Sequence, residues 1–384
     1  MKNYHRLYLF SVLILAIACN KSIQIEPNNL NELIVVDTLY VDKSENYSYT
    51  FMPRWQTKVL NDTSYFILSG TSSKGLQLLL LEDKTLSYKR TTTIPQFGPN
   101  GFKTNSPSFY WHNRDSIFVF PTSLNEVFLY NRNSELMKTY QFNYLLDLSF
   151  DSNVQQQGGA LINNVLFINS VPYANPNHLN FTSNTYVSHS LNLQTNEIKV
   201  VSGYPEKLKN HILPTSFLGG QIVQAFDSLL LINNFYSDSI DYFKINSPDH
   251  KRLSTGLTGY QHLTGQTNPV NNQGPDSFVL QLRNPNYYKL IYDPFSKNLL
   301  RFSRHINKQY ENYSDSEILR EVENNNPKLL LNTLISIDSS MRKTYYRIPF
   351  NIEYVFPTND GLIIQTSSLE LESKDVYLKI RLNK

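Results

Sequence analysis

Short apolar runs separated by polar turns recur along most of this chain. In each unit a turn pair precedes an apolar or β-branched run, and after a polar break a second run follows that ends near an aromatic residue. Short runs rich in Val, Ile, Tyr and Phe between Asn/Asp/Ser/Gly clusters are typical of β-strands. The units begin at Asn61-Asp62, Asp115-Ser116, Asn163-Asn164, Asp227-Ser228, Asp276-Ser277 and Asn359-Asp360.

The spacing of these units, about 50 residues in most intervals, predicts an all-β fold of the β-propeller type with four short strands per blade. A β-sandwich or a set of unrelated hairpins is the alternative. We expect six blades, with seven as an alternative because the last interval is long. That interval contains a predicted helix, Ser314–Glu323, with capping-box spacing between Ser314 and Glu317. It also contains two further predicted strands, Leu329–Asp338 and Lys343–Phe350.

The ends of the propeller are expected to meet. Residues Leu33–Val41 form an apolar strand pattern that suits pairing with the C-terminal blade. Such pairing closes the ring with the N- and C-terminal strands and removes exposed sheet edges. We therefore assign residues 33–384 to a single propeller domain.

The N-terminus carries an export pattern. Lys2 and Arg6 precede the apolar stretch Leu7–Ala18, which is too short to span a bilayer core as a helix of about 20 residues. Cys19 follows directly and resembles the lipobox cysteine of bacterial lipoproteins. An ordinary cleavable signal with a chance cysteine, or a buried apolar strand, is the alternative. The resemblance implies a signal peptide at residues 1–18, lipidation of Cys19 (palmitate among the acyl chains) and a lipid-anchored tether at residues 19–32.

The amino-acid composition limits the classes of partner and of covalent or metal site that the chain can have. The formal net charge is +3, and Lys2 and Arg6 supply two of these charges, so no basic face points to nucleic acid. Cys19 is the only cysteine, which excludes a disulfide within the chain and a cysteine-based metal site. The 26 Tyr and 22 Phe supply apolar surface for a large β-rich core.

Several segments resemble TolB-like six-bladed β-propeller lipoproteins of unknown function. Gln96–Phe102 is similar to a Gly-x-Gly-Pro-Gly-Glu-Phe segment of that family, although Phe97 replaces its first glycine and Asn100-Gly101 stand where Gly-Glu is usual. Trp111–Val119 and Tyr292–Phe302 also look like such lipoproteins. The resemblance implies the fold and an envelope location, and it implies no reaction.

Catalytic and cofactor motifs are absent from the sequence. The eight histidines show no His-x-x-x-His or His-x-His spacing, and there is no nucleophile elbow, phosphate-binding glycine loop or dinucleotide fingerprint. We therefore predict no metal site and no cofactor. Most Asp and Asn residues fall at turns, where turn chemistry explains them. A cation site assembled across blades from acids and amides remains the alternative.

Candidate binding residues come from aromatic and basic positions. Arg54, Trp55, Trp111 and His112 precede the first apolar runs of two units, so we expect them on innermost or top-face segments, where the aromatics either bind a ligand or pack between blades. Tyr173 and His178 lie in the long polar loop 172–178, a candidate contact surface. Arg283 and Arg301 lie at predicted strand ends and are candidates for the channel mouth.

These patterns favour an exported, lipid-anchored β-propeller that acts as a non-catalytic binding or scaffold module for an envelope protein or a glycan. The alternative is a hydrolase or lyase with a cation-dependent site in the central channel, and the sequence leaves enzyme activity open. Asn20–Ile23 lacks an acidic run. We therefore expect the periplasmic face of the outer membrane rather than the cell surface.

Overall fold

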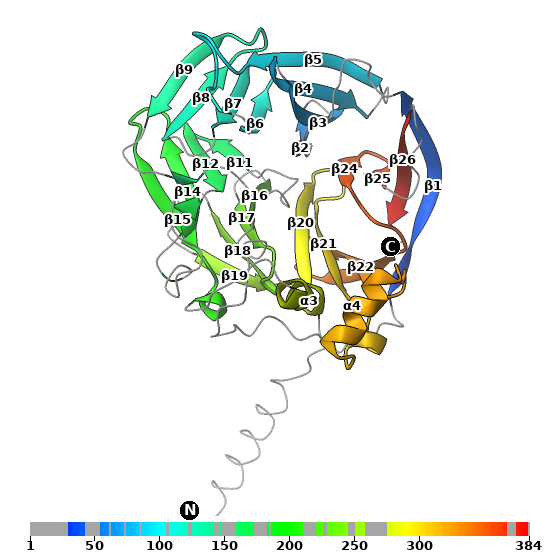
Figure 1. Ribbon diagram of the computed structural model, residues 1–384. Coiled ribbons are helices and arrows are strands. Elements are labelled where there is room, and N and C mark those ends of the chain that lie inside the picture. Colours follow the sequence, from blue (N-terminus) through cyan, green and yellow to red (C-terminus); the bar gives the residue numbers. More distant parts are fainter. Residues whose placement is uncertain are drawn as a thin grey trace, which may run out of the picture.

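The computed structural model shows a ring of small β-sheets around a central opening (Figure 1). It describes residues 30–42, 54–60, 63–72, 74–83, 87–104, 107–121, 125–141, 146–147, 159–169, 171–172, 183, 186–209, 220–225, 229–244, 250–257, 275–366 and 374–382. The loop with Tyr173 and His178, and the segment with Cys19, lie outside these residues.

Four sheets of the ring have the same construction. Each contains four strands that follow one another in sequence, and every neighbouring pair is antiparallel. Their strands are β2 (Arg54–Leu60), β3 (Thr63–Ser72), β4 (Gly75–Glu82) and β5 (Ser87–Pro95); β6 (Ser108–Asn113), β7 (Ser116–Phe120), β8 (Glu126–Tyr130) and β9 (Leu136–Gln141); β11 (Gly159–Ile162), β12 (Val165–Asn169), β14 (Tyr186–Asn192) and β15 (Ile198–Gly203); β16 (Gly220–Ala225), β17 (Leu229–Asn234), β18 (Ser239–Lys244) and β19 (His250–Ser254).

The remaining large sheet has eight strands in the order β20-β21-β22-β23-β1-β26-β25-β24. They are β20 (Asn286–Asp293), β21 (Asn298–Ile306), β22 (Leu330–Ile337), β23 (Lys343–Ile348), β1 (Asn31–Asp42), β26 (Lys374–Leu382), β25 (Gly361–Gln365) and β24 (Tyr354–Thr358). The expected closing strand is thus β1, which pairs antiparallel with β26 along its length and meets β23 in parallel through Asn31 and Glu32. A short pair, β10 (Leu146–Asp147) with β13 (Val171–Pro172), completes the described strands.

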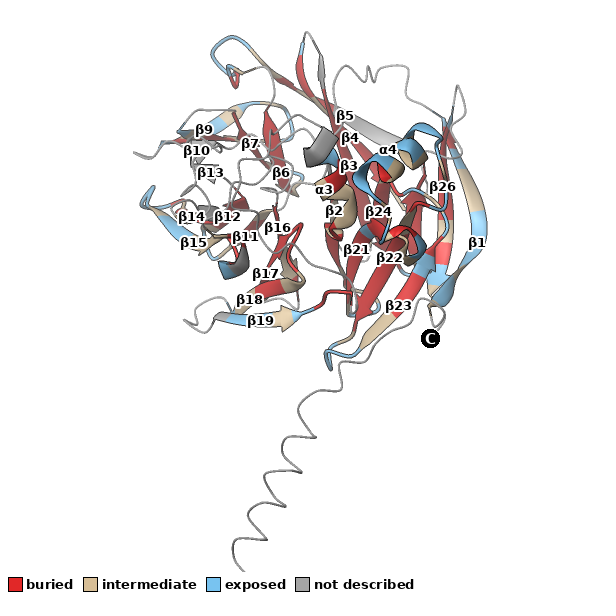
Figure 2. Ribbon diagram, turned by 60° about the horizontal axis from the view of Figure 1, so that its bottom comes forward, coloured by how far each residue is buried: buried red, intermediate tan, exposed pale blue. Residues whose placement is uncertain are grey.

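Hydrophobic clusters between neighbouring sheets hold the ring together. Central strands such as β4 and β17 are buried almost continuously (Figure 2), and so is β25, because both of their faces pack against another sheet. Outer strands such as β9 and β15 are far more exposed. Trp111 lies in the cluster that joins the β2–β5 sheet to the β6–β9 sheet, and Ile222 lies in the cluster that joins β11–β15 to β16–β19.

The sheet arrangement modifies the expected blade count. The fold is all-β and propeller-like, with four four-stranded sheets and one eight-stranded sheet in place of six separate sheets. The predicted strands Leu329–Asp338 and Lys343–Phe350 are present as β22 and β23, and both belong to the eight-stranded sheet.

One predicted strand is wrong. The apolar run Phe278–Leu280 is part of the helix α3 (Pro275–Arg283) and not of a strand. Its Val279 is buried in a cluster with Ile306 and Ile318, so this run packs on one face against its neighbours. Three consecutive apolar residues do not distinguish a buried strand from one turn of helix, and here tertiary packing favours the helix.

The predicted helix near residue 314 is confirmed as α4 (Asp315–Glu323). The Ser314 hydroxyl accepts a hydrogen bond from the Glu317 backbone N–H, and the Glu317 carboxylate accepts one from the Ser314 N–H at 2.7 Å. Among the described residues, no helix is long and apolar enough to cross a bilayer.

Turn chemistry is also observed at several strand connections. The side-chain oxygens of Asn131, Asn192 and Asp338 accept hydrogen bonds from backbone N–H groups two residues further along the chain. Because such Asx turns stabilise tight connections, these Asn and Asp residues have a structural role.

Candidate functional site

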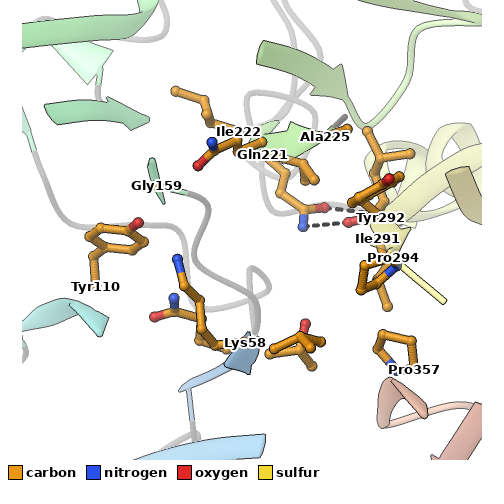
Figure 3. A pocket seen from close by; sticks show the side chains of 16 residues that line it. Lys58, Tyr110, Gly159, Gln221, Ile222, Ala225, Ile291, Tyr292, Pro294 and Pro357 are labelled. Atoms are coloured by element: carbon orange, nitrogen blue, oxygen red, sulfur yellow. Dashed lines mark hydrogen bonds between the residues drawn. The ribbon is translucent and has the colours of Figure 1, made fainter. Parts of the chain in front are cut away.

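A cavity of about 230 Å³ lies where the innermost strands converge (Figure 3). Its lining comes from β2, β6, β11, β16, β20 and β24, so every large sheet of the ring contributes to it. Radially stacked sheets cannot meet at the axis, and a propeller therefore has a central channel. A concave site on rigid strands is the default location for ligand binding in such a fold.

Two glutamine side chains in the wall of this cavity join inner strands of neighbouring sheets through hydrogen bonds. The Gln56 amide accepts a hydrogen bond from the Trp111 N–H at 2.7 Å and donates one to the Trp111 carbonyl at 2.9 Å. The Gln221 amide of β16 does the same with Leu290 of β20, at 2.8 Å for both bonds (Figure 3). Each side chain thus acts like a further strand residue and satisfies backbone groups at the sheet edge. The wall is preformed by these bonds.

Lys58 brings a positive charge into the cavity. The side chain is half-buried, and its ammonium lies 5.7 Å from the centre of the Tyr110 ring (Figure 3). Burial lowers the pKa of Lys58 because removal from water disfavours the charged form. The described part of the chain offers this ammonium no carboxylate partner.

Tyr110 and His112 complete the polar corner beside Lys58. The Tyr110 hydroxyl accepts a hydrogen bond from the Leu161 N–H at 3.2 Å and lies 3.4 Å from the His112 Nδ1. Burial raises the pKa of Tyr110 to about 12, so the phenol stays protonated. Burial, with a smaller contribution from the Lys58 charge, lowers the pKa of His112 to about 4, so its imidazole is neutral near pH 7.

Gly159 provides the space for the Tyr110 ring. A Cβ atom at Gly159 would lie 3.0 Å from the Cδ2 atom of Tyr110, which is tighter than ordinary contact. The close approach of β11 therefore fixes the ring that faces Lys58. The remaining wall is largely apolar and includes Ile222, Ile291 and Pro357.

The chemistry of the cavity is that of a binding site with one cation. Its described lining contains amides, a threonine, the phenols of Tyr110 and Tyr292, and Lys58, but no carboxylate. Within the same described residues, no cluster of three or more His, Cys, Asp or Glu side chains is arranged to hold a metal ion.

The structure places the residues predicted near the channel in different environments. Arg54 and Trp55 lie on β2, the innermost strand of its sheet, as expected, but their side chains are outside the described set. Trp111 is 2% exposed and packs between two sheets, 5.8 Å from the Tyr65 ring. Of the predicted aromatics and bases whose side chains are described, His112 is the one placed beside Lys58 and Tyr110.

The two arginines predicted at the channel mouth lie elsewhere. Arg283 ends α3 rather than a strand, and its guanidinium binds Asp315 together with the carbonyls of Glu311 and Tyr313. Arg301 is fully buried in β21, between the sheets. The sequence placed both at strand ends; the inserted helix and the inter-sheet packing determine their actual positions.

Lys58, Tyr110 and Gln221 were not singled out from the sequence. Lys58 lies two positions after Gln56, and Arg54, Gln56 and Lys58 occupy every second position of β2. This alternation is a weak signal that the three side chains share one face of an inner strand. Tyr110 adjoins Trp111 and points the other way. Which neighbours share a face depends on the sheet register, which the sequence alone does not define.

Residues 31–322 match a family described as a domain of unknown function, DUF4221. The chain belongs to this family. A crystal structure of a DUF4221 member from Bacteroides vulgatus superposes with a TM-score of 0.71 at 16% identity, covering 92% of this chain and 98% of the other. At this identity the likeness shows a shared DUF4221 fold.

More distant solved structures are also similar to this DUF4221 chain. A virginiamycin B lyase from Staphylococcus aureus gives a TM-score of 0.41 at 8% identity and covers 89% of this chain and 98% of the other. Kuenenia stuttgartiensis hydrazine synthase gives 0.43 at 9%, covering 85% and 77%. Scores below 0.5 carry no argument about function. No curated protein matches the chain.

Proposed function

We propose that this DUF4221 chain is an exported, lipid-anchored β-propeller that binds a protein or glycan partner without catalysis, using the central cavity. The observation that carries the proposal is the preformed cavity at the ring axis, with sealed amide walls and the ammonium of Lys58 beside Tyr110. A rigid concave surface with few polar groups suits recognition, because little ordering is required on binding.

The ring itself is proposed to have six blades. The order β20-β21-β22-β23 and the order β24-β25-β26-β1 each repeat the four-strand pattern of the other sheets. The two halves of the eight-stranded sheet join through the parallel pairing of Asn31 and Glu32 with Tyr346 and Arg347. One innermost strand from each half, β20 and β24, reaches the cavity, which supports counting them as separate blades.

The location is proposed from the N-terminal pattern. Residues 1–18 would be removed, Cys19 acylated, and the propeller held at the periplasmic face of the outer membrane by the tether 19–32, as in TolB-like lipoproteins. Stable anchoring takes more than one acyl chain. We expect Cys19→Ser to release the protein from the membrane fraction. Unchanged membrane fractionation of this variant contradicts the lipid anchor.

Partner binding is tested by crosslinking the tagged full-length protein in its native envelope and by a glycan array. Thr57→Trp places a large ring in the cavity from β2, and Thr139→Trp adds the same ring to the outer strand β9 as a matched control. We expect Thr57→Trp to reduce recovery of the partner at least tenfold, and Thr139→Trp to leave it unchanged. Equal recovery with both variants contradicts a role for the cavity. Turnover of a substrate that is lost on changing cavity residues would replace binding by catalysis.

A further inference from the structure

The central cavity holds one positive charge that no carboxylate of the described residues neutralises. Lys58 approaches the Tyr110 ring face, but a ring contact compensates a cation far less than a hydrogen-bonded anion does. No carboxylate of the described residues pairs with Lys58. Keeping a half-buried ammonium without a counter-ion is unfavourable unless a ligand supplies one.

We propose that the cavity binds a small carboxylate-bearing molecule, whose carboxylate pairs with Lys58 and accepts a hydrogen bond from the Tyr110 hydroxyl. This assignment rests on the proposed function as a binding module and names the chemical class of its ligand. The Tyr110 oxygen already accepts the Leu161 N–H, so its own hydrogen is the group to donate, and a ligand carboxylate would compete for it with the long 3.4 Å contact to His112 Nδ1.

The neighbouring side chains leave Lys58 as the group that recognises the charge of the ligand. His112 is neutral at physiological pH, because burial and the Lys58 charge lower its pKa to about 4. It therefore adds no second cation, and its Nδ1 faces the Tyr110 hydroxyl at 3.4 Å. Gln56 and Gln221 have both amide ends committed to backbone groups, so they shape the wall and leave the charge recognition to Lys58.

The single charge distinguishes a carboxylate from a phosphate. Lys58 is the one cationic side chain in the described lining of the cavity. Phosphate sites generally combine several cations or a row of backbone N–H groups, since the ligand carries nearly two charges and three acceptor oxygens. The one ammonium of the described lining matches the single charge of a carboxylate.

Size and wall character limit the rest of the ligand. The cavity of about 230 Å³ exceeds what single waters need, yet is smaller than the roughly 300–1,000 Å³ of drug-sized sites. Partly buried apolar residues of the lining, such as Val59, Val223 and Pro294, border the non-ionic part. A free sugar acid, or one acidic residue of a larger chain, fits these dimensions.

Isothermal titration of the detergent-solubilised full-length protein with sodium glucuronate and with glucose provides the test. The two probes share a ring and differ at one carbon, which carries a carboxylate in glucuronate and a hydroxymethyl group in glucose. We expect one glucuronate site and at least tenfold weaker binding of glucose. Lys58→Met should bring glucuronate to the glucose level, and Lys58→Arg should restore at least part of the difference.

A matched lysine controls for general loss of charge. Lys138 lies 4.6 Å from the centre of the Tyr140 ring on the outer strand β9, a lysine–tyrosine contact outside the cavity. Lys138→Met should leave glucuronate binding unchanged. The thermal midpoint of each variant is measured alongside, so that an unfolded protein is recognised and Lys58→Arg becomes the deciding variant.

Three results overturn the proposal: neither probe binds, both bind equally, or Lys58→Met keeps the full preference for glucuronate. Tighter binding of glucose 6-phosphate than of glucuronate overturns the carboxylate assignment in favour of a phosphate. If partner recovery still falls with Thr57→Trp while glucuronate fails to bind, the binding function stands and the ligand class is wrong. If Thr57→Trp leaves partner recovery unchanged and glucuronate does not bind either, both the proposed binding function and the ligand class are wrong.

Discussion

Arg301 extends from β21 into the sheet formed by β16–β19, and its guanidinium is fully enclosed there. It donates hydrogen bonds to Asn233 Oδ1 at 2.9 Å and to the Ser237 carbonyl at 2.7 Å, and it also binds the Thr255 hydroxyl. The guanidinium lies 3.8 Å from the centre of the Tyr287 ring. At the scale of residues, such polar side chains join one sheet to the next.

Replacing Arg301 should therefore lower stability. Arg301→Leu leaves several buried acceptors unsatisfied, and we expect a loss of about 3 kcal/mol in the free energy of unfolding. Arg342→Leu is the control, because the Arg342–Asp338 ion pair is exposed and such pairs contribute about 1 kcal/mol or less. Chemical denaturation of both variants provides the measurement. Equal stability of the two variants contradicts a structural role for Arg301.

Lys289 gives a second residue-scale prediction, on pH. It is 2% exposed and donates to the carbonyls of Ile352 and Glu353. Burial lowers its pKa to about 7, whereas an unfolded lysine keeps its proton to about pH 10. Between these values the unfolded state binds more protons, so stability rises with pH.

The expected size is on the order of 1 kcal/mol per pH unit between pH 7 and 10, measured as wild type minus Lys289→Met. The comparison between variants removes the contribution of tyrosines and other lysines. Parallel stability curves for the two proteins over this range would show that Lys289 enters the folded state with its proton.

At the scale of elements, the α-helices α3 and α4 pack together beside β21. Val279, Ile306 and Ile318 are buried in their shared cluster, and Arg283 of α3 binds Asp315 at the start of α4. The helices are stabilised mainly by this packing, because isolated helices of nine residues are not stable.

The N-cap of α4 should contribute measurably. Ser314→Ala removes the hydroxyl that accepts the Glu317 N–H, and we expect a local loss of about 1 kcal/mol. Faster hydrogen exchange of the first amides of α4 is the readout. Ser340→Ala, in the exposed turn between β22 and β23, should leave exchange in α4 unchanged. Unchanged exchange in Ser314→Ala contradicts a capping contribution.

At the scale of the whole molecule, the ring is closed by the first described strand. β1 pairs with β26 from Leu33 to Asp42, so residues more than 300 apart in sequence share one sheet. Val41 is 3% exposed and lies in the cluster that also contains Phe66 of β3 and Phe356 of β24. Closure therefore completes a core built from several sheets.

Two neighbouring substitutions test this closure. Val41→Asp buries a carboxylate in the cluster and should cost about 3 kcal/mol or more. Tyr40→Asp changes a side chain that is 59% exposed and should cost less than about 1 kcal/mol. Thermal unfolding compares them. A Val41→Asp protein as stable as Tyr40→Asp would mean that the ring does not depend on β1.

Much of the fold was predictable because it is local. Runs such as Ile117–Phe120 and Leu229–Ile232 are strands, and Ser314 caps a helix, since periodicity and capping residues act within a few positions. The run Phe278–Leu280 was misassigned because its pattern is too short to select a strand or a helix. The joining of two four-strand groups into one sheet involves backbone pairing between Asn31 and Tyr346, which no local pattern encodes.

The candidate site was predictable only in part. The positions of Arg54-Trp55 and Trp111-His112 on innermost strands followed from the repeat, yet Trp111 faces the core and Lys58 the cavity. The sequence by itself determined an all-β chain of repeated short strands with polar turns. The tertiary structure alone decided that β2, β6, β11, β16, β20 and β24 meet at one axis and bring Lys58 beside Tyr110. The physical reason is that strand periodicity is a local property, whereas the convergence of side chains depends on register and on how the sheets pack.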